Sequence, residues 1–227
     1  MDGLDPGFVA ATRRRDLLLT LVMLGILLTP AWLTPDWISL PWRITFAILG
    51  PPAVYFSWRY SPWWPTPSAE LPRILHHLAL SPGDAFCDLG AGDGRMVLWV
   101  HRATGARCVG IEISPLQYLL AQTRLAVQGT SGTTIRLGDL FAADLSGFDA
   151  VYIWGTAYLV STPEFSGHVR TALRPGARLV SYHYPVPGLK AEAIDTDGLR
   201  PVYVYVPVPP RPGPASPGSV GEGLPAE

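Results

Sequence analysis

The sequence predicts an α/β fold in which a largely parallel sheet carries helices on both faces, behind an N-terminal hydrophobic helical hairpin. Apolar segments of strand and helix character alternate from residue 85 to residue 184. A glycine-rich loop joins the first strand of this series to its helix at residues 88–95. Two uncharged runs lie within the first 58 residues. Strand–helix alternation is typical of a parallel sheet covered on both faces, and the fold class follows from it.

Residues 16–59 are predicted to form a membrane anchor of two transmembrane helices. Leu17–Leu33 contains 17 residues without a charge, and Ile44–Trp58 contains 15. A spanning helix needs about 17–25 such residues, so the first run reaches the lower limit and the second falls slightly short. Three arginines precede the first run, and Arg59 follows the second. The positive-inside rule therefore places both flanks in the cytoplasm, with the anchor in the inner membrane.

Two other interpretations of these runs stay open. One is a cleaved signal peptide, although no small-x-small cleavage site follows the first run. The other is a hairpin that only dips into the membrane, because Gly50-Pro51-Pro52 interrupts the second run. In the two-span interpretation, residues 1–15 form a cytoplasmic tail and the domain after residue 59 faces the cytoplasm.

The remaining chain divides into a linker, one domain and a tail. Residues 60–67 are rich in proline and tryptophan and form a stiff linker, since each proline disfavours helix at the residue before it. The domain comprises residues 68–207. Ser68 is predicted to cap a helix whose apolar residues share one face: Leu71, Ile74, Leu75 and Leu78. Residues 208–227 are rich in proline, glycine and serine and are predicted to be disordered.

Seven strands are predicted for the domain. Five of them alternate with helices and should be parallel, at residues 85–89, 107–113, 134–137, 150–154 and 178–184. Helices are expected at residues 95–103, 115–128 and 163–173, the second after the cap signal Ser114-Pro115-Leu116-Gln117. Two further strands, at 191–194 and 202–206, lie too close together for a crossover helix. They should therefore form an antiparallel hairpin at the sheet edge.

The loop Asp88-Leu89-Gly90-Ala91-Gly92-Asp93-Gly94-Arg95 indicates a nucleotide-type cofactor. Its glycines let the backbone lie directly against a ligand, and the helix that follows offers free N–H groups. The glycine spacing differs from the G-x-G-x-x-G of dinucleotide folds. The neighbouring acids therefore decide which cofactor fits.

Three acids at strand ends favour a cofactor with a ribose, an adenine and a cationic centre. Glu112 ends the second strand, where a carboxylate accepts both hydroxyls of a ribose, a group shared by NAD and S-adenosylmethionine. Asp139 follows the third strand and can accept from an adenine amino group, with Leu140 beside the ring. Asp88 would repel a pyrophosphate but suits a cationic centre and an ammonium group.

Together with the Pro175-Gly176 turn before the fifth strand, these residues resemble the class I, seven-β-strand methyltransferases, whose sheet is Rossmann-like. The resemblance covers roughly residues 65–207 and implies S-adenosyl-L-methionine as the cofactor. A nicotinamide enzyme is the alternative. The cofactor-binding residues that the resemblance implies are Asp88, Gly90, Ala91, Gly92, Gly94, Glu112, Ile113, Asp139 and Leu140.

The chain is also similar to a narrower group, the membrane-anchored mitochondrial protein-lysine methyltransferases and their bacterial relatives. A hydrophobic segment precedes the pre-motif Trp64-Pro65-Thr66-Pro67, and the first motif has the form Asp-Leu-Gly-x-Gly-Asp-Gly-Arg. The C-terminal part is short, running from residues 182–187 into the hairpin. In that group the pre-motif helps to hold the cofactor, so the resemblance implies a cofactor contact for Pro65 and Thr66.

The catalytic residues are less evident than the cofactor site. Trp154 or Tyr158 can form an aromatic wall for a methylammonium group, and His183 can act as a general base. Structural roles stay open as the alternative: Trp154 as a core residue and His183 as a hydrogen-bonded structural histidine. The Asn/Asp-Pro-Pro-Tyr signature is absent and the net charge is −1, which argues against nucleic acid. No metal site is expected, and Cys87 and Cys108 should be buried, reduced thiols.

The sequence thus predicts a membrane-anchored, S-adenosylmethionine-dependent methyltransferase that N-methylates a lysine or other amine on a membrane-associated protein. Two alternatives stay open. The anchor would equally suit a methyltransferase for a lipid, a quinone or another hydrophobic small molecule. Because no base is identifiable after the fourth strand, a catalytically inactive, S-adenosylmethionine-binding membrane assembly factor is the second alternative.

Overall fold

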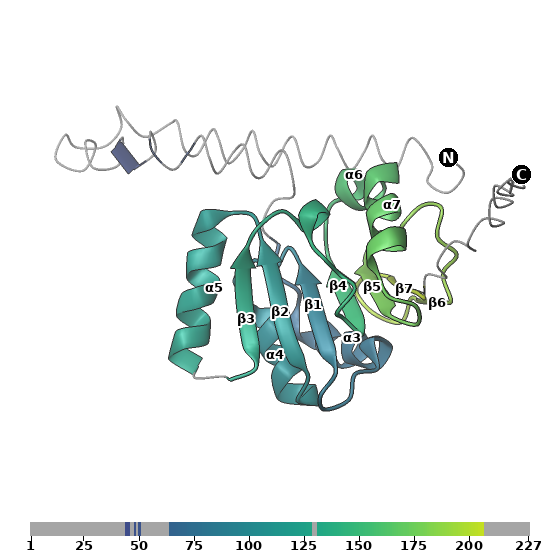
Figure 1. Ribbon diagram of the computed structural model, residues 1–227, viewed down its shortest axis with the longest axis horizontal. Coiled ribbons are helices and arrows are strands. Elements are labelled where there is room, and N and C mark those ends of the chain that lie inside the picture. Colours follow the sequence, from purple (N-terminus) through teal and green to yellow (C-terminus); the bar gives the residue numbers. More distant parts are fainter. Residues whose placement is uncertain (1–43, 46–47, 49, 51–63, 129–130, 207–227) are drawn as a thin grey trace, which may run out of the picture.

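The computed structural model describes residues 44–45, 48, 50, 64–128 and 131–206 (Figure 1). Of the predicted anchor, only four residues belong to this part of the chain, so the two-span prediction lies almost wholly outside it. The tails predicted at residues 1–15 and 208–227 also lie outside the described residues. Within the described ranges, no helix has the length and apolar character needed to cross a bilayer.

A seven-stranded sheet forms the centre of the domain, in the order β3-β2-β1-β4-β5-β7-β6 (Figure 1). The strands are β1 Ala85–Leu89, β2 Arg107–Glu112, β3 Thr133–Leu137, β4 Ala150–Ile153, β5 Arg178–Tyr182, β6 Ala193–Asp195 and β7 Val202–Tyr205. Neighbours among β1 to β5 pair in parallel, whereas β7 runs antiparallel to both β5 and β6. The predicted seven strands and the antiparallel hairpin at the edge are confirmed.

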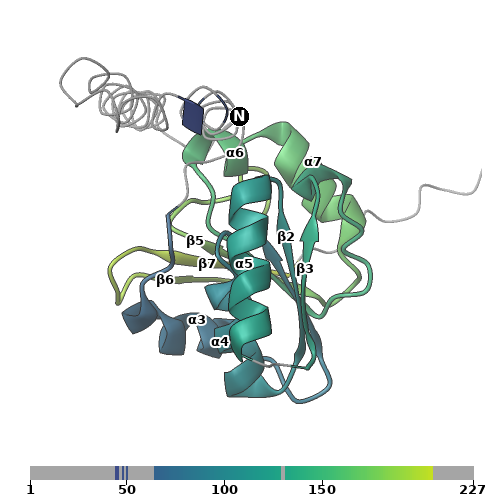
Figure 2. The same ribbon diagram turned by 90° about the vertical axis from the view of Figure 1, so that its left-hand side faces the viewer.

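Helices cover both faces of the sheet, as Figure 2 shows. One face carries α3 Leu71–Leu78, α4 Arg95–Thr104 and α5 Pro115–Gln128, and the other carries α6 Ala157–Val160 and α7 Pro163–Ala172. Two short 3-10 turns, η2 Ser68–Glu70 and η3 Leu140–Ala142, complete the described elements. The sequence does not predict α6 or the two turns, because elements of three or four residues are too short to show a period.

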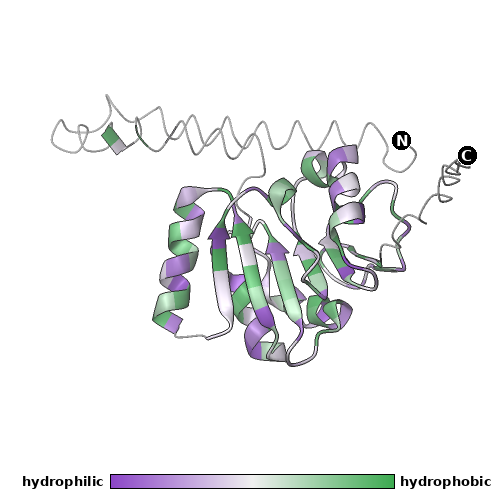
Figure 3. Cartoon of the chain, in the orientation of Figure 1, coloured by the Kyte–Doolittle hydropathy of each residue, from purple (hydrophilic) through white to green (hydrophobic). Residues whose placement is uncertain are grey.

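The core lies on both sides of the sheet, which explains why its strands are nearly continuous apolar runs. All five residues of β1 are buried. Phe86 and Val180 belong to the cluster under α3, α4 and α5, and Val151 and Leu179 belong to the cluster under α6 and α7. Figure 3 shows the result as mainly green central strands beneath mixed purple and green helices.

Two details of the prediction are wrong. Ser68 does not cap the first helix: it starts η2, and Glu70 precedes α3 without a capping side-chain bond. Pro72 can occupy the first turn of α3 because that position needs no N–H donor.

The fifth strand ends at Tyr182 rather than at residue 184, since His183 has a φ of 81° and leaves the extended conformation.

Candidate active site

The carboxyl ends of the five parallel strands meet at one edge of the sheet, marked by the arrowheads in Figure 1. This edge brings together Asp88, Glu112, Asp139, Trp154 and His183, which lie far apart in the sequence. β1 has β2 on one side and β4 on the other, so the strand order reverses at β1. Ligands of open α/β sheets bind at such a switch point, and the predicted site residues surround it.

The glycine loop after β1 is held against the end of β2. The N–H groups of Gly90 and Ala91 donate to the Ile111 carbonyl at 2.9 and 3.0 Å. Gly90 has a φ of 90°, and nothing lies within 4 Å of where its side chain would start. In β2, a Cβ on Gly110 would lie 2.5 Å from the Ala91 Cβ, so only glycine lets the loop approach the sheet this closely. The open side of Gly90 therefore offers backbone contact to a ligand.

Glu112 is placed by the same loop. Its Oε2 accepts from the Gly92 N–H at 2.7 Å, and its Oε1 accepts from the Ser114 N–H at 2.8 Å. Burial raises the pKa of this carboxyl, and the backbone donors counteract the rise. An ionised carboxylate has about four lone-pair sites, so each oxygen can accept one more hydrogen bond. That capacity suits the two hydroxyls of a ribose.

Asp88 is a buried acid beside a second one. It retains 3% exposure at the end of β1. Burial, followed by the charges of Glu112 and Asp93, raises the pKa of Asp88 to about 8. A cationic ligand would favour the ionised form and reverse this rise. The residues present thus fit a ligand that carries a sulfonium and an ammonium group.

Asp93 of the loop has a structural role that the sequence analysis missed. Its carboxylate pairs with Arg95 at 2.7 Å and with Arg124 of α5 at 2.6 Å. Arg124 also donates to the Asp93 carbonyl at 2.9 Å. The pairs tie the glycine loop to the start of α4 and to α5. The Asp93–Arg95 pair is suggested by the spacing of two residues in the sequence. The Asp93–Arg124 pair joins distant residues, and no spacing rule predicts it.

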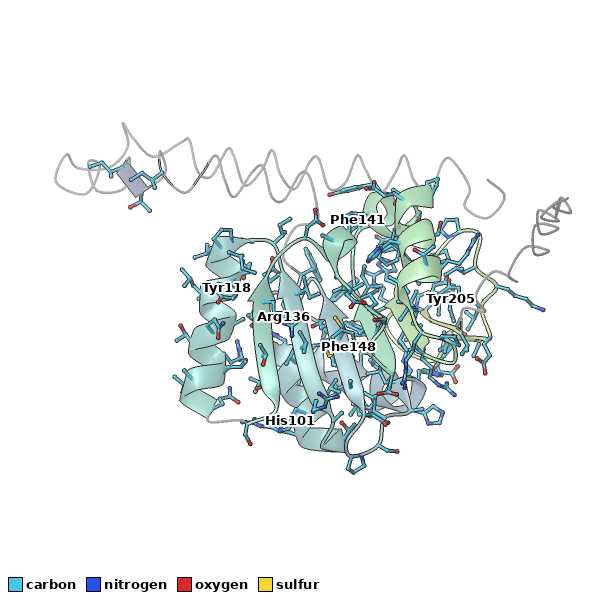
Figure 4. All side chains as sticks on the ribbon, viewed as in Figure 1. His101, Tyr118, Arg136, Phe141, Phe148 and Tyr205 are labelled. Atoms are coloured by element: carbon cyan, nitrogen blue, oxygen red, sulfur yellow. The ribbon has the colours of Figure 1, made fainter. Side chains whose placement is uncertain are left out.

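Asp139 shapes the turn that follows β3. Its Oδ1 accepts from the Phe141 N–H at 2.9 Å and so starts η3, while Leu140 is buried in the core. Figure 4 shows Phe141 at the carboxyl edge of the sheet, and its ring lies 6.4 Å from those of both Phe165 and His168. The turn is thus rigid, and it holds Asp139 where the sequence predicts the adenine contact.

The pre-motif, which precedes the domain in the chain, contacts the strand next to β1. The buried Thr66 hydroxyl lies 3.0 Å from the Tyr152 hydroxyl of β4. Tyr152 pairs in register with Asp88, so Thr66 is fixed beside the end of β1. Pro65 is half-buried and Trp64 is exposed. The structure therefore brings Thr66 beside Asp88, whereas for Pro65 it shows only a half-buried ring one residue earlier in the chain.

Known proteins match this chain over the same region. A family described as the ANTKMT methyltransferase domain matches residues 88–193. A protein-lysine N-methyltransferase of Saccharolobus islandicus is 28% identical over 153 residues, which is 64% of this chain and 92% of the relative. A lysine N-methyltransferase of Rattus norvegicus, named for its ATP synthase substrate, is 25% identical over 145 residues, which is 63% of this chain. The match covers 65% of the rat protein, less than two thirds of its length.

A solved structure agrees with these relatives. An RNA methyltransferase from Salinibacter ruber, in complex with S-adenosyl-L-homocysteine, superposes with a TM-score of 0.61 at 28% identity. The match covers 69% of this chain and all of that chain (100%). The sheet, the site and these matches together support a class I methyltransferase. The protein is an enzyme, and S-adenosylmethionine is its cofactor.

The methyltransferase would hold this cofactor with the residues already described. Glu112 would accept from the ribose hydroxyls, Asp139 from the adenine amino group, and Asp88 would face the cationic end. The open side of Gly90 would lie against the ligand. Ile113, directly after β2, is half-buried beside Glu112.

The acceptor side of the methyltransferase lies at the ends of β4 and β5. The half-buried Trp154 meets the Tyr182 ring edge-on, with centroids 4.9 Å apart. Among the described residues, the Thr156 hydroxyl is buried without a hydrogen-bond partner. Tyr158 is half-buried in α6, and the His183 ring lies 4.0 Å from that of Tyr184. The three predicted catalytic candidates, Trp154, Tyr158 and His183, thus all follow the ends of β4 and β5, and the sequence analysis missed Thr156.

Other titratable groups have structural roles. His101 bonds the Ala106 carbonyl at 2.8 Å, and His77 bonds Asp195 at 2.6 Å. Both cysteines are free and buried, as predicted, and burial raises the pKa of the Cys108 thiol to about 12. Within the described residues, no three histidine, cysteine or acidic side chains gather as a metal site.

Proposed function

We propose that this methyltransferase N-methylates a lysine side chain of a protein. The observation that carries the proposal is the match to protein-lysine N-methyltransferases, one of which aligns over 92% of its length. The half-buried Trp154, which packs edge-on against the buried Tyr182, supports it, because an aromatic ring next to the transferred methyl suits a methylammonium product. Both relatives described above carry this activity in their names, and the acceptor side offers chemistry that fits it.

The chemistry asks the protein to align a neutral amine with the methyl donor. The bound cofactor supplies an electrophilic methyl group. The amine lone pair forms the new N–C bond as the C–S bond breaks, and the former bond pair stays on sulfur. Trp154 and Tyr182 would shield the acceptor from water, since burial disfavours the charged ammonium and helps to keep the amine neutral. Alignment and desolvation, rather than metal chemistry, would then be the tasks of these residues.

We infer that the enzyme works at the cytoplasmic face of the inner membrane, on a membrane-associated protein. Two uncharged runs of 17 and 15 residues precede the domain, with arginines on both flanks. These runs lie almost wholly outside the described residues, so the support comes from the sequence. Carbonate extraction of cell membranes, followed by protease treatment of spheroplasts, tests it. An integral protein whose domain is protected in intact spheroplasts is expected, and release by carbonate would overturn the proposal.

Two other acceptors compete with protein lysine. A lipid or quinone suits the uncharged runs, and an RNA substrate has the precedent of the Salinibacter ruber protein. A net charge of −1 gives no electrostatic attraction for RNA, and the Asn/Asp-Pro-Pro-Tyr signature of many base methyltransferases is absent. A lysine acceptor therefore remains the better-supported proposal.

One labelling experiment separates the acceptors. Membranes and cytosol from cells lacking the protein are incubated with purified enzyme and radiolabelled S-adenosylmethionine, then divided into protein, lipid and RNA. Label is expected in protein, and acid hydrolysis should release it as methyl-lysine. A Glu112→Ala variant is the control for label from other enzymes. Label confined to lipid or to RNA would overturn the lysine proposal and identify the actual class of acceptor.

A further inference from the structure

A group of polar contacts joins α3 to the C-terminal hairpin. Arg73 of α3 pairs with Glu70 and donates to both the side chain and the carbonyl of Asp195, each at 3.1 Å. His77, one turn further along α3, lies 2.6 Å from the second carboxylate oxygen of Asp195. We call Glu70, Arg73, His77 and Asp195 the helix–hairpin cluster. Its members come from segments more than 110 residues apart in the chain.

The loop between β6 and β7 closes around the same cluster. The Leu199 N–H donates to Glu70 Oε1 at 3.1 Å, and Arg73 donates to the Arg200 carbonyl. A Cβ on Gly198 would lie 2.5 Å from the Arg73 guanidinium, so this loop packs directly on the arginine. The Arg73 and Glu70 side chains keep only 14% and 6% exposure. Because a buried charge is costly without its partners, the cluster favours one arrangement of helix and loop.

The cluster is linked to the pre-motif. The Glu70 N–H donates to the Pro67 carbonyl at 3.0 Å and closes η2, so a single hydrogen-bonded turn joins Glu70 to the residue that follows Thr66. Thr66 in turn contacts Tyr152, which is the register partner of Asp88. Asp88, Tyr182 and Glu70 all act electrostatically on the Tyr152 hydroxyl. Buried polar groups thus extend from the hairpin loop to the cofactor site.

We propose that Arg73 and Asp195 are positioning residues for cofactor binding, because they hold the pre-motif over the methyl-donor site from the far edge of the sheet. The inference rests on the prediction that Thr66 borders the cofactor. It does not depend on the identity of the methyl acceptor. Neither residue touches the cofactor loop, so an effect on cofactor affinity would be transmitted through α3 and η2.

The first test measures binding of S-adenosylhomocysteine to the full chain by calorimetry. Asp195→Asn removes one negative charge from the cluster and should weaken binding roughly tenfold, within the range of coupling through packed networks. Glu192→Gln is the matched control, since it removes the same charge from an exposed position of the same hairpin. Equal affinities for the two variants would overturn the proposal. Gly198→Ala, which keeps every charge and displaces Arg73, provides an independent route if Asp195→Asn does not fold.

The second test is a double-mutant cycle between the hairpin and the pre-motif. Thr66→Val removes the contact with Tyr152 and should weaken binding several-fold. Distant, independent sites combine additively in free energy, so their effects on affinity would multiply. We expect instead that Asp195→Asn adds little once Thr66 is changed, because both act through one segment. Multiplied effects, or no effect of Thr66→Val, would overturn the proposal. If the labelling experiment shows no methyl-lysine, the proposed acceptor is wrong, but both binding results are unaffected. The two proposals can therefore fail separately.

Discussion

The two halves of the active-site edge are built from different chemistry. At the ends of β1, β2 and β3 stand three carboxylates, Asp88, Glu112 and Asp139, two of them held by backbone donors. At the ends of β4 and β5 there is no carboxylate, and Trp154 and Tyr182 meet edge-on instead. The first half matches the polar groups of one fixed cofactor. The second half, where we propose that the acceptor binds, has the half-buried Trp154 packed on the buried Tyr182.

This difference explains why the sequence identifies the donor more readily than the acceptor. A ribose, an adenine and a cation each require a specific hydrogen-bonding or charged group, so the acids recur at predictable strand ends. An amine that must lose its charge needs shape and a dry surface, which many side chains can supply. The predictions below test whether donor and acceptor functions are separable along this edge.

The largest effect is expected for Glu112→Ala. It removes the carboxylate for both ribose hydroxyls and also the acceptor of the Gly92 N–H that shapes the glycine loop. Losing two charge-assisted hydrogen bonds, each contributing about 1.5–3 kcal/mol, should weaken S-adenosylmethionine binding at least about 100-fold. Calorimetry measures the affinity, and Glu164→Ala, an exposed acid in α7, is the control. Retained affinity in Glu112→Ala would show that the donor half binds its ligand by another route.

The second prediction concerns the stability of the donor half. Asp93→Asn weakens the pairs with Arg95 and Arg124 and should lower the free energy of unfolding by about 2 kcal/mol. Chemical denaturation measures this change. The exposed Asp144, which accepts from the Ser146 N–H in its own turn, offers Asp144→Asn as a control with a much smaller loss. If both variants unfold at the same denaturant concentration, the loop is not held by these pairs.

The fold was predictable from the sequence to the extent that local pattern and tertiary packing agree. The inner strands β1, β4 and β5 are largely apolar, the edge strand β3 is mostly polar and exposed, and the hairpin follows from two short runs too close for a crossover. Contacts between distant segments leave no such pattern. Arg124 on Asp93 and Arg73 on Asp195 join residues 31 and 122 positions apart, so only the folded chain reveals them.

Some features were unpredictable because they oppose local preference. A threonine before a helix normally caps it, yet Thr156 precedes α6 without a capping bond. A histidine rarely adopts a positive φ, yet His183 does so directly after β5. Both deviations lie on the acceptor side of the edge. Ala79, which ends α3, has a positive φ as well, so such a deviation does not by itself assign a function.

The third prediction is a pH dependence of cofactor binding. With a pKa of about 8, Asp88 of the free enzyme holds a proton at neutral pH, whereas a cationic ligand requires the ionised form. Affinity should therefore rise about tenfold per unit between pH 6 and 7.5. Asp88→Asn should flatten the profile and weaken binding at pH 7.5. A flat profile for the unchanged protein would show that Asp88 is already ionised without ligand.

The same shift affects stability with a definite sign. The folded state keeps the Asp88 proton up to about pH 8, whereas the unfolded state loses it near the ordinary value of 3.8 for this pKa. The contribution of Asp88 to the free energy of unfolding therefore falls as the pH rises from about 4 to about 8. Asp88→Asn should remove this fall in the cofactor-free protein, as denaturation at several pH values would show.

The smallest effect is expected on the acceptor side, at Thr156. Its hydroxyl is buried without a partner among the described residues, so the isosteric Thr156→Val should raise the free energy of unfolding by about 1 kcal/mol. Thr162 is a matched control with the opposite sign. Its hydroxyl caps α7 by accepting from the Phe165 N–H at 3.1 Å, and Thr162→Val should cost about 1 kcal/mol.

The two threonine variants also separate stability from function. Cofactor affinity should be unchanged in both, since neither residue belongs to the donor half. If the Thr156 hydroxyl is retained for the acceptor, methyl transfer to protein should fall several-fold in Thr156→Val despite its greater stability, and Thr156→Ser should restore it. Equal stabilities for Thr156→Val and Thr162→Val would mean that Thr156 has a partner in solution. The unpaired hydroxyl would then no longer distinguish the acceptor side from the donor side.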